Sequence, residues 1–540
     1  MTEDVADAAV RCAVDWSGPV RATLPDEAAV QAACGIMHVH GRSAGRPLAL
    51  GVDYASVVAG VLAAQGTLAA EIARVRGARY GEVRTSVAQA ALLSVQQYLA
   101  VAATDPADEA APRSEVDGGR RPPFTTADGV RCELETLDAQ PWLRFWQALG
   151  AEKSAIARGW FPFQQRFGTA TCALPIALHD VIGRTAFAQV RTAAAESGVA
   201  VLPIRDDPAS PWEVPACTGT ALPAAAPRTW SVPAAAPLEG IVVVESTRRV
   251  QGPVAGHVLR MLGAEVIRVE PPGGDPMRGL PPMAGDCSVR YRSLNDGKRT
   301  VEVDIKSAAG RRELHDLVAG AEAFVHNWAP GKAAQLGLDA ADLVRSSPGL
   351  VYAWASGWGD AAGPNPPLGT DFLVQAGSGL AAALTPRGTP AAPSLMTLTD
   401  VLGGLVCANG VLAGLLRRVR TGEGTRVDTS LLSGASLIPR DQLHRPTATD
   451  GPLRTADGFL VLPRDIDPAA ARAVFGCAPD DIAFRCRDQA TRTWVQRGAE
   501  VGVELTPVCT NLRDIAADAR FNSALGRAEH LFPLPPWEFS

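Results

Sequence analysis

The chain has 540 residues, so it is long enough for two or more domains with large buried cores. Its net charge of −6 provides no basic surface for the phosphate backbone of a nucleic acid. No uncharged apolar run reaches about 18 residues, and the acidic first four residues do not resemble a signal peptide. The ten cysteines lack a C-x-x-C spacing, which predicts buried thiols in a reducing compartment. We therefore expect a cytoplasmic α/β enzyme without a membrane or nucleic-acid partner.

Two parts of the chain share short motifs in the same order. The matching pairs are 126–129 (TADG) with 455–458, 198–204 with 502–508, 30–32 with 374–376, Gly35 with Gly379, and Ser86 with Ser430. Motifs that recur in a constant order are typical of an internal duplication. The pattern predicts that residues about 10–205 and about 354–510 are two copies of one module.

Each predicted copy contains a Gly-rich turn, a long apolar helix, a second helix and a small mixed domain. Apolar runs predict the long helices over residues 57–72 and 401–416. Val52-Asp53 precedes the first of these helices as Thr399-Asp400 precedes the second, and either Thr399 or Asp400 could cap the second. The TADG turn begins the small domain, which continues in the first copy with a helix over residues 140–149.

Residues 206–236 are rich in Pro, Ala and Thr, which predicts a semi-rigid linker. The following stretch, 237–278, predicts a βαβ unit that occurs only once. Residues 241–244 predict a strand buried on both faces, Pro253 suits the first turn of a helix that Gly263 closes, and 265–269 predict a second strand. Such a unit binds ligands at the carboxyl end of its first strand. Because G-x-G-x-x-G is absent, the pattern does not favour a dinucleotide.

The wording of this unit, PLEGIVVVE…GP…LGAEVIRVEPP, resembles the opening of the family III CoA-transferases, the CaiB/BaiF family, which includes 2-methylacyl-CoA racemases. The resemblance continues in order through motifs at residues 294–299, 327–331, 336–338, 348–352 and 357–359. It implies a Rossmann-like parallel-sheet large domain with smaller α+β domains. It also implies coenzyme A or an acyl-CoA as substrate, a carboxylic acid as the other small molecule, and no metal. Members of the family form homodimers whose two chains can interlock, so a homodimer is expected.

Repeats and resemblance together divide the chain into five parts. These are 1–115, the N-terminal copy of the back half of the large domain; 116–205, the first small domain; 206–236, the linker; 237–445, the CoA-binding large domain; and 446–540, a second, shortened small domain with a tail. The N-terminal copy resembles the remnant of a fused second subunit. Interlocking of two chains and an intrachain pseudo-dimer both remain open at this point.

The resemblance implies a CoA site in the unique unit. Val250, Gln251 and Pro253 would line the turn under the pantetheine or phosphate. The other implied contacts are Arg278, Lys298 and Arg299 for the phosphates, with Asn295 beside them, and Asn327 for the cofactor. The alternative is that these are ordinary turn residues and surface cations. Pro271 stands where the family often has an arginine that packs on adenine.

The family's transferases use an aspartate that attacks the thioester and passes through anhydride and aspartyl-CoA intermediates. In the family pattern, as we interpret it, this residue precedes a Gly-x-Pro. That position is Arg387 here, and Ala44 in the first copy. The sequence thus predicts that the usual nucleophile is missing.

The racemases use a His/Asp pair on either side of an acidic α-carbon. Asp400 matches the aspartate, but Thr370 replaces the histidine of the Gly-His-Asp triplet and Gln335 replaces an assisting arginine. Asp400 and Asp371 therefore remain as candidate catalytic residues. The alternatives are that Asp400 only caps its helix and that Asp371 is a solvated turn residue.

His38 and His40 alternate as strand residues do, and neither has a further ligand at metal-binding spacing. One of them would replace the lost base if the N-terminal copy covered the pocket. Three hypotheses follow: CoA transfer with a rearranged site, proton transfer or elimination at an acyl-CoA α-carbon using Asp400, and a relative that binds a ligand without CoA transfer or serves another reaction.

Overall fold

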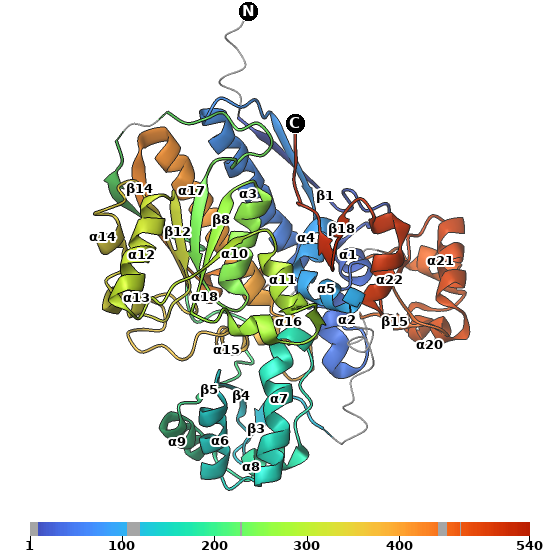
Figure 1. Ribbon diagram of the computed structural model, residues 1–540. Helices are drawn as coiled ribbons and strands as arrows, with labels where there is room; N and C mark the ends of the chain where they lie inside the picture. Colours follow the sequence, from blue (N-terminus) through green and yellow to red (C-terminus); the bar gives the residue numbers. More distant parts are fainter. Residues whose placement is uncertain (1–8, 105–118, 227–228, 441–450, 465) are drawn as a thin grey trace, which may run out of the picture.

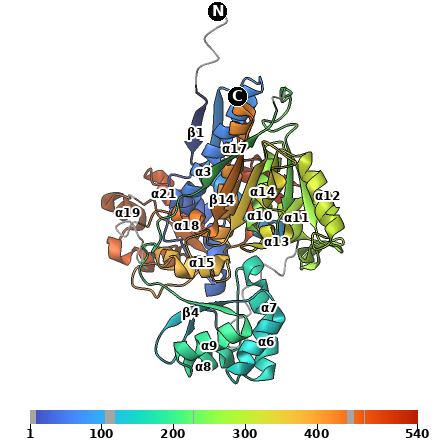
Figure 2. The ribbon, with the colours of Figure 1, turned by 90° about the vertical axis from the view of Figure 1, so that its left-hand side faces the viewer.

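The computed structural model describes residues 9–104, 119–226, 229–440, 451–464 and 466–540 (Figures 1 and 2). Its centre is a seven-stranded sheet in the order β11-β8-β7-β12-β13-β14-β6, parallel except for β6. The strands are β6 (Thr218–Ala224), β7 (Val242–Ser246), β8 (Glu265–Glu270), β11 (Arg299–Glu302), β12 (Ala323–His326), β13 (Val351–Ser356) and β14 (Glu423–Ser430). Buried valines and alanines form the inner strands, as expected of a parallel sheet covered on both faces.

Helices cover both faces of this sheet. On one face, α10 (Gln251–Met261) and α17 (Leu398–Thr421) belong to the main core. On the other, α12 (Ala308–Ala319) and α14 (Ala340–Leu343) form a second core with Val244, Ile267 and Phe324. The remaining elements of this part are β9 (Met283–Ala284), β10 (Cys287–Ser288), α11 (Val289–Asn295), α13 (Lys332–Leu336), α15 (Asp371–Gly377), α16 (Leu380–Leu384) and α18 (Leu431–Ser436).

The predicted βαβ unit is present as β7, α10 and β8, with β7 parallel to β8. Pro253 is the third residue of α10, where its missing N–H has no intrahelical partner to lose. Gly263 follows the end of the helix with φ +103, a conformation that favours glycine.

The predicted linker is wrong in one respect. Residues 218–224 form β6, which pairs antiparallel with β14 and closes one edge of the sheet. Pro223 is tolerated there because an edge strand need not donate from every N–H.

The N-terminal part contains two parallel strands and a long helix, as the β13–α17–β14 region of the large domain does. Its elements are β1 (Arg11–Asp15), α1 (Glu27–Ala33), α2 (Ile36–Gly41), α3 (Tyr54–Val75), β2 (Glu82–Ser86), α4 (Val87–Ser94) and α5 (Gln96–Thr104). β1 is parallel to β2 as β13 is to β14, and Ser86 and Ser430 cap the next helix in each case. His38 and His40 lie on α2, so the strand-like interpretation of these residues is wrong.

The long helices α3 and α17 lie side by side in the core, and side chains of one reach the backbone of the other (Figure 1). Tyr54 Oη donates to the Leu398 carbonyl at 2.9 Å, and Gln65 Nε2 donates to the Leu405 carbonyl at 2.7 Å. By length and composition both helices could cross a membrane, but 83% of the most apolar window of α17 and 50% of that of α3 are buried inside the protein.

Two small domains extend from this body. The first contains β3 (Phe124–Thr125), β4 (Arg131–Glu135), α6 (Ala139–Ala148), α7 (Lys153–Thr169), α8 (Ile176–Gly183), α9 (Phe187–Ser197) and β5 (Ala200–Pro203), and lies below the central sheet in Figure 2. The second contains β15 (Leu453–Arg454), β16 (Phe459–Val461), α19 (Pro468–Phe475), α20 (Ile482–Arg485), α21 (Thr491–Glu500) and β17 (Thr506–Pro507). The final elements are α22 (Leu512–Ala517), β18 (Leu525–Arg527), β19 (Leu531–Pro533) and β20 (Glu538–Phe539), and β20 pairs with β2.

All ten cysteines are free, but not all are buried, because Cys12 is exposed on β1. This corrects the expectation of uniformly buried thiols.

A network of buried charges lies between α10 and the strands β7 and β8 of the βαβ unit. Arg268 forms ion pairs with Glu245, Glu270 and Asp275, and Lys298 Nζ lies 2.8 Å from Glu245 Oε2. A Cβ at Gly256 would overlap the Glu245 carboxylate. Only glycine at this position leaves room for the charge pair.

We predict that Gly256→Ala lowers the free energy of unfolding by about 3 kcal/mol, because it forces a buried charge away from its partners. Urea denaturation followed by circular dichroism measures this. The matched control is Gly60→Ala on α3, where a Cβ meets nothing within 4 Å. The control should leave stability unchanged or raise it by up to about 1 kcal/mol, and equal losses in the two variants would contradict the prediction.

Candidate functional site

A cavity of about 1570 Å³ lies at the carboxyl ends of the parallel strands, where the first small domain faces the sheet. The sheet side contributes residues 246–249 after β7, 269–272 after β8, 303–306 after β11, 327–330 after β12 and 355–359 after β13. The small domain contributes Glu135, Asp138, Phe167, Arg191 and residues 198–201. The volume exceeds the usual range for small-molecule pockets, about 300–1,000 Å³, so a long ligand fits.

The cavity lies at the point where the strand order diverges. From β7 the chain continues outward to β8 and β11, whereas β12 leads to β13 and β14 on the other side. Open α/β sheets bind ligands at such a point. Asn327 joins the two loops there, because its Oδ1 accepts from Arg248 N at 3.0 Å and its Nδ2 donates to the Arg248 carbonyl at 2.9 Å.

Of the predicted CoA contacts, Gln251 and Asn327 line this cavity. Gln251 also holds the start of α10 against β13 by donating to the Ser356 carbonyl at 3.0 Å. Val250, which is 1% exposed, and Pro253 are buried at the start of the same helix and do not line it. Pro271 does line it.

The predicted phosphate-binding cations lie elsewhere. Lys298 is buried, with Nζ donating to Glu245, to the Pro253 carbonyl and to Asn295 Oδ1, and burial lowers its pKa to about 8. Arg278 pairs with Glu270 and donates to Tyr291 Oη, and Arg299 pairs with Glu265 at the start of β11, the end opposite the cavity. The expectation that these cations face the ligand cavity is therefore not met. The cations that do line it are Arg191, Arg248, Arg249, Lys306 and Lys332.

Asp371 and Asp400 both line the cavity, but their carboxylates are bonded differently. Asp371 is 3% exposed, and its Oδ2 accepts from Asp400 N and Thr399 Oγ1, each at 2.8 Å, while Oδ1 accepts from Gln375 Nε2. The interpretation of Asp371 as a solvated turn residue is wrong. Instead its carboxylate satisfies the free N–H at the start of α17.

Asp400 is the third residue of α17, behind the N-cap Thr397, so it is not the cap that the sequence suggested. Within the described residues, its carboxylate forms no hydrogen bond or ion pair with another protein group. Burial raises the pKa of Asp400 well above its ordinary value, Asp371 and Glu135 raise it further, and the positive charge of Arg249 opposes them. Burial also raises the pKa of Asp371, to about 6, although its hydrogen bonds favour ionisation.

The N-terminal part contains an arrangement like that of Asp371, formed by residues that do not line the large cavity. Glu27 accepts from Ala55 N at 2.8 Å and Ser56 N at 2.9 Å, and Gln31 donates to it at 3.0 Å. Glu27 thus stands where Asp371 does, and Ser56 where Asp400 does. The pairing of Asp53 with Asp400 is therefore wrong, because Asp53 occupies the N-cap position of α3, as Thr397 does in α17.

The two positions from which we predicted a missing nucleophile do not face the cavity. Arg387 and Ala44 are both exposed, and neither lines it. Their identity therefore has no bearing on a carboxylate at the site. His40 also lies outside the lining and bonds to Ser394 Oγ at 2.8 Å, so neither it nor His38 supplies a base there.

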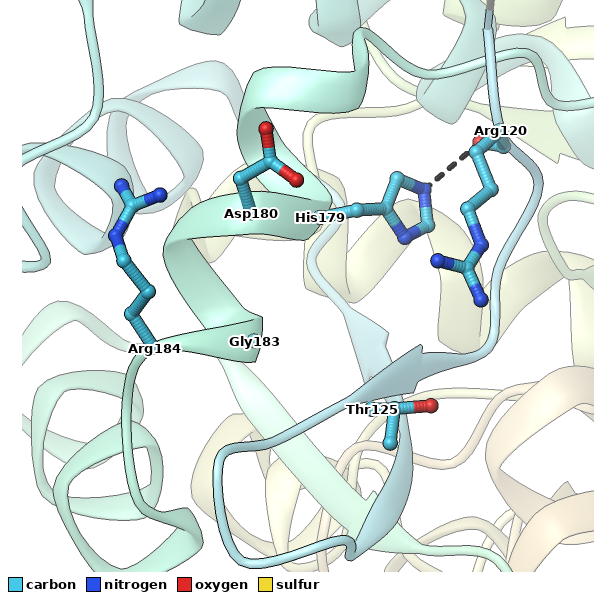
Figure 3. A pocket seen from close by; sticks show the side chains of 6 residues that line it. All are labelled: Arg120, Thr125, His179, Asp180, Gly183 and Arg184. Carbon is cyan, nitrogen blue, oxygen red and sulfur yellow. Dashed lines mark hydrogen bonds between the residues drawn. The ribbon is translucent and has the colours of Figure 1, made fainter.

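A smaller hollow of about 270 Å³ lies on the first small domain, between Arg120, Thr125 and α8 (Figure 3). His179 points across it and bonds to the Arg120 carbonyl at 2.8 Å, and its ring stacks on Phe124. Burial lowers the pKa of His179 to about 4, so it is neutral at physiological pH. The hollow is also lined by Asp180, Gly183 and Arg184, and it is much smaller than the cavity at the strand ends.

The fold and the larger cavity define an α/β protein with a large cavity at the carboxyl edge of a parallel sheet. The sequence pattern of CoA-transferase family III matches residues 15–209 and 238–530. The chain therefore belongs to CoA-transferase family III, which confirms the resemblance.

Two curated relatives illustrate the similarity. Succinyl-CoA:glutarate CoA-transferase of Mus musculus is 35% identical over 245 residues, covering 42% of this chain and 56% of that protein. Acetyl-CoA:oxalate CoA-transferase of Acetobacter aceti is 30% identical over 253 residues, covering 46% of this chain and 65% of that protein. The chain thus spans between about half and two thirds of the length of these relatives. The crystal structure of a CaiB/BaiF family protein from Brucella suis aligns with a TM-score of 0.50 at 25% identity, over 56% of this chain and 93% of that chain.

Because folding raises the pKa of Asp400, the folded chain holds that proton more tightly than the unfolded chain, and stability falls as pH rises past about 3.9. We predict that Asp400→Asn raises the free energy of unfolding at pH 7 by about 1 kcal/mol, and that this gain disappears near pH 4. Urea denaturation at several pH values measures it. Asp286→Asn, at a fully exposed side chain, is the control and should show no such gain. A gain of equal size at both pH values would contradict the assignment.

Proposed function

We propose that the chain transfers CoA between an acyl thioester and a carboxylic acid, with Asp400 as the nucleophile. The observation that carries this proposal is the Asp400 carboxylate, which faces a large cavity without a protein hydrogen bond among the described residues. A poorly solvated carboxylate is a strong nucleophile towards a thioester carbonyl. The relatives that act as CoA-transferases support the same chemistry.

The proposed reaction needs no group besides the two substrates and Asp400. The Asp400 carboxylate attacks the thioester carbon, CoA leaves as thiolate, and a mixed anhydride forms. The thiolate then attacks the Asp400 carbonyl, giving an aspartyl-CoA thioester and the free donor acid. The acceptor carboxylate attacks this thioester, and the released thiolate attacks the acceptor side of the second anhydride, which regenerates Asp400.

The phosphates of CoA fit the sheet side of the cavity. Arg248, Lys306 and Lys332 line it at the ends of β7, β11 and β12, where parallel sheets bind phosphates. Asn327 supports this region by holding the Arg248 backbone. Lys298 contributes indirectly, since it stabilises Glu245 beneath the loop.

Proton transfer at an acyl-CoA α-carbon is a second candidate, because carboxyl groups line the cavity from both walls. Asp400 on α17 would exchange the proton with a bound ligand, and Glu135 on β4 of the first small domain lines the facing wall, paired with Arg166 at 3.2 Å. Running the assay below in heavy water separates the two candidates, since only α-proton transfer incorporates deuterium into the acyl group.

We predict that Asp400→Asn abolishes exchange, lowering the rate at least 1,000-fold, whereas Arg387→Asp leaves it within twofold. The measurement is mass spectrometry of acyl-CoA products from a panel of donors and carboxylic acids. A peptide containing Asp400 should carry the mass of CoA when only the donor is present. Absence of exchange across the panel for the wild-type chain, or full activity in Asp400→Asn, would refute the proposal.

We also propose that residues about 10–205 and about 354–510 are two copies of one module and that one chain completes one site. The sheet wall of the cavity belongs to the large domain, and the facing wall belongs to the first small domain, which precedes the large domain in the same chain. Glu135 and Arg464 occupy corresponding positions in the two proposed copies, because each lies nine residues after the threonine of its TADG motif. Glu135 faces the cavity, whereas Arg464 pairs with Asp53 and donates its N–H to Asp26 at 2.8 Å. Arg464 is thus paired within the protein, whereas Glu135 at the corresponding place lines the cavity.

A complementation experiment tests the intrachain site. Asp400→Asn removes the proposed nucleophile, and Phe167→Glu places a negative charge on the small-domain wall. When the two inactive variants are coexpressed and purified through separate tags, we expect no recovery of exchange. Recovery of about half of the wild-type rate, from the one unaltered cavity of each mixed dimer, would show that the cavity is shared between two chains.

A further inference from the structure

Arg249 is the most unusual backbone position in the cavity wall. Its φ of +64 lies in the left-handed region, which in the described residues only one other non-glycine residue, Ala170, shares. A side chain in this conformation is strained, and such strain persists where the surroundings impose it, commonly at ligand sites.

The surroundings of Arg249 are fixed on both sides. Asn327 bonds both the N–H and the carbonyl of Arg248, and Arg268 Nη2 donates to the Thr247 carbonyl at 3.1 Å. On the other side, α10 begins at Gln251. The chain therefore presents this arginine to the cavity from a rigid loop.

The Arg249 side chain extends to the opposite wall. It lines the cavity, and its guanidinium lies 5.7 Å from the centre of the Phe167 ring on α7 of the first small domain. Arg166 on the same helix is instead committed to Glu133 and Glu135. Among the described residues, Arg249 has no hydrogen bond or ion pair to any protein group, so its five donors are available to a ligand.

Asp400 and Arg249 face the same cavity but form no ion pair with each other in the part of the chain that the structure describes. The charge of Arg249 is close enough to lower the pKa of Asp400. Both side chains therefore line the same cavity without pairing with each other. A ligand whose one end reacts at Asp400 can place an anionic group on Arg249 at its other end.

We propose that Arg249 binds the second, non-reacting carboxylate of a dicarboxylic acyl acceptor, and so selects dicarboxylic over monocarboxylic acids. This inference rests on the proposed CoA transfer at Asp400. A planar guanidinium suits a carboxylate because two parallel N–H groups match its two oxygens. The positive charge of Arg249 also opposes the repulsion that the carboxyl groups of the cavity wall would exert on a dianion.

The test compares glutarate with pentanoate, which has the same chain length and a single carboxylate. In Arg249→Met we expect the KM for glutarate to rise at least tenfold with kcat within threefold, while the KM for pentanoate changes less than twofold. Arg249→Lys, which keeps the charge but not the fork, should show an intermediate loss. The ratio of the two kcat/KM values is the readout.

Arg248→Met is the matched control, because Arg248 also lines the cavity but has an ordinary backbone. It should leave the glutarate-to-pentanoate ratio within twofold, even where it weakens the CoA donor. An unchanged ratio in Arg249→Met, or an equal fall in Arg248→Met, would overturn the inference.

A separate measurement shows whether the proposed CoA transfer itself fails. Formation of the Asp400 thioester from an acyl-CoA donor alone requires no acceptor and no dicarboxylate. Loss of this adduct in the wild-type chain refutes the proposed function. If the adduct forms in both wild type and Arg249→Met while glutarate loses its advantage only in the variant, the assignment of Arg249 is supported.

Discussion

The packing of α3 against α17 is the constraint on which the other features depend. Side chains of α3 donate to backbone carbonyls of α17 at Leu398 and Leu405, more than 300 positions later in the chain. Each of these buried donors would be costly to leave unsatisfied, so the register between the two helices is specific. Through this contact the N-terminal part is fixed beside the central sheet, and the small domain that follows it faces the carboxyl ends of the strands. The cavity is a consequence of that placement.

Two carboxylates next to each other at the start of α17 take different roles because of their hydrogen bonds. Asp371 accepts from the backbone and a side chain of the helix it caps, and Glu27 does the same for α3, although Glu27 does not line the large cavity. The same arrangement at two helices indicates that it serves to satisfy the N–H groups at a helix start. The Asp400 carboxylate caps no helix, because the backbone N–H of Asp400 is itself the group that Asp371 caps. Its side chain is consequently free to face the ligand, and its position in the repeat is occupied by Ser56 in the first part.

Several site residues could not be predicted from the sequence because their roles depend on which way a side chain turns. Lys298 lies in a family motif and is a cation, yet it is buried against Glu245. Arg249 lies in no pattern that we recognised, yet it faces the cavity from a backbone conformation that the sequence does not indicate. The sequence also did not predict that Glu135 lines the cavity. The TADG motif nine residues earlier predicts a turn, but it does not indicate which way the side chains of the following strand point. A carboxylate paired with a cation and one pointing into a cavity look the same in a sequence.

The sequence by itself determined the family, the parallel βαβ unit, the two long apolar helices and the order of the repeated motifs, because these depend on local periodicity and on residues close together in the chain. Asp400, Asp371, Gln251 and Asn327 were also found from sequence, since they lie in motifs. Only the tertiary structure decided that Arg387 lies outside the cavity, that Asp371 is a cap, and that residues 218–224 form an edge strand. Each of these outcomes depends on contacts between segments far apart in sequence, which local patterns do not encode.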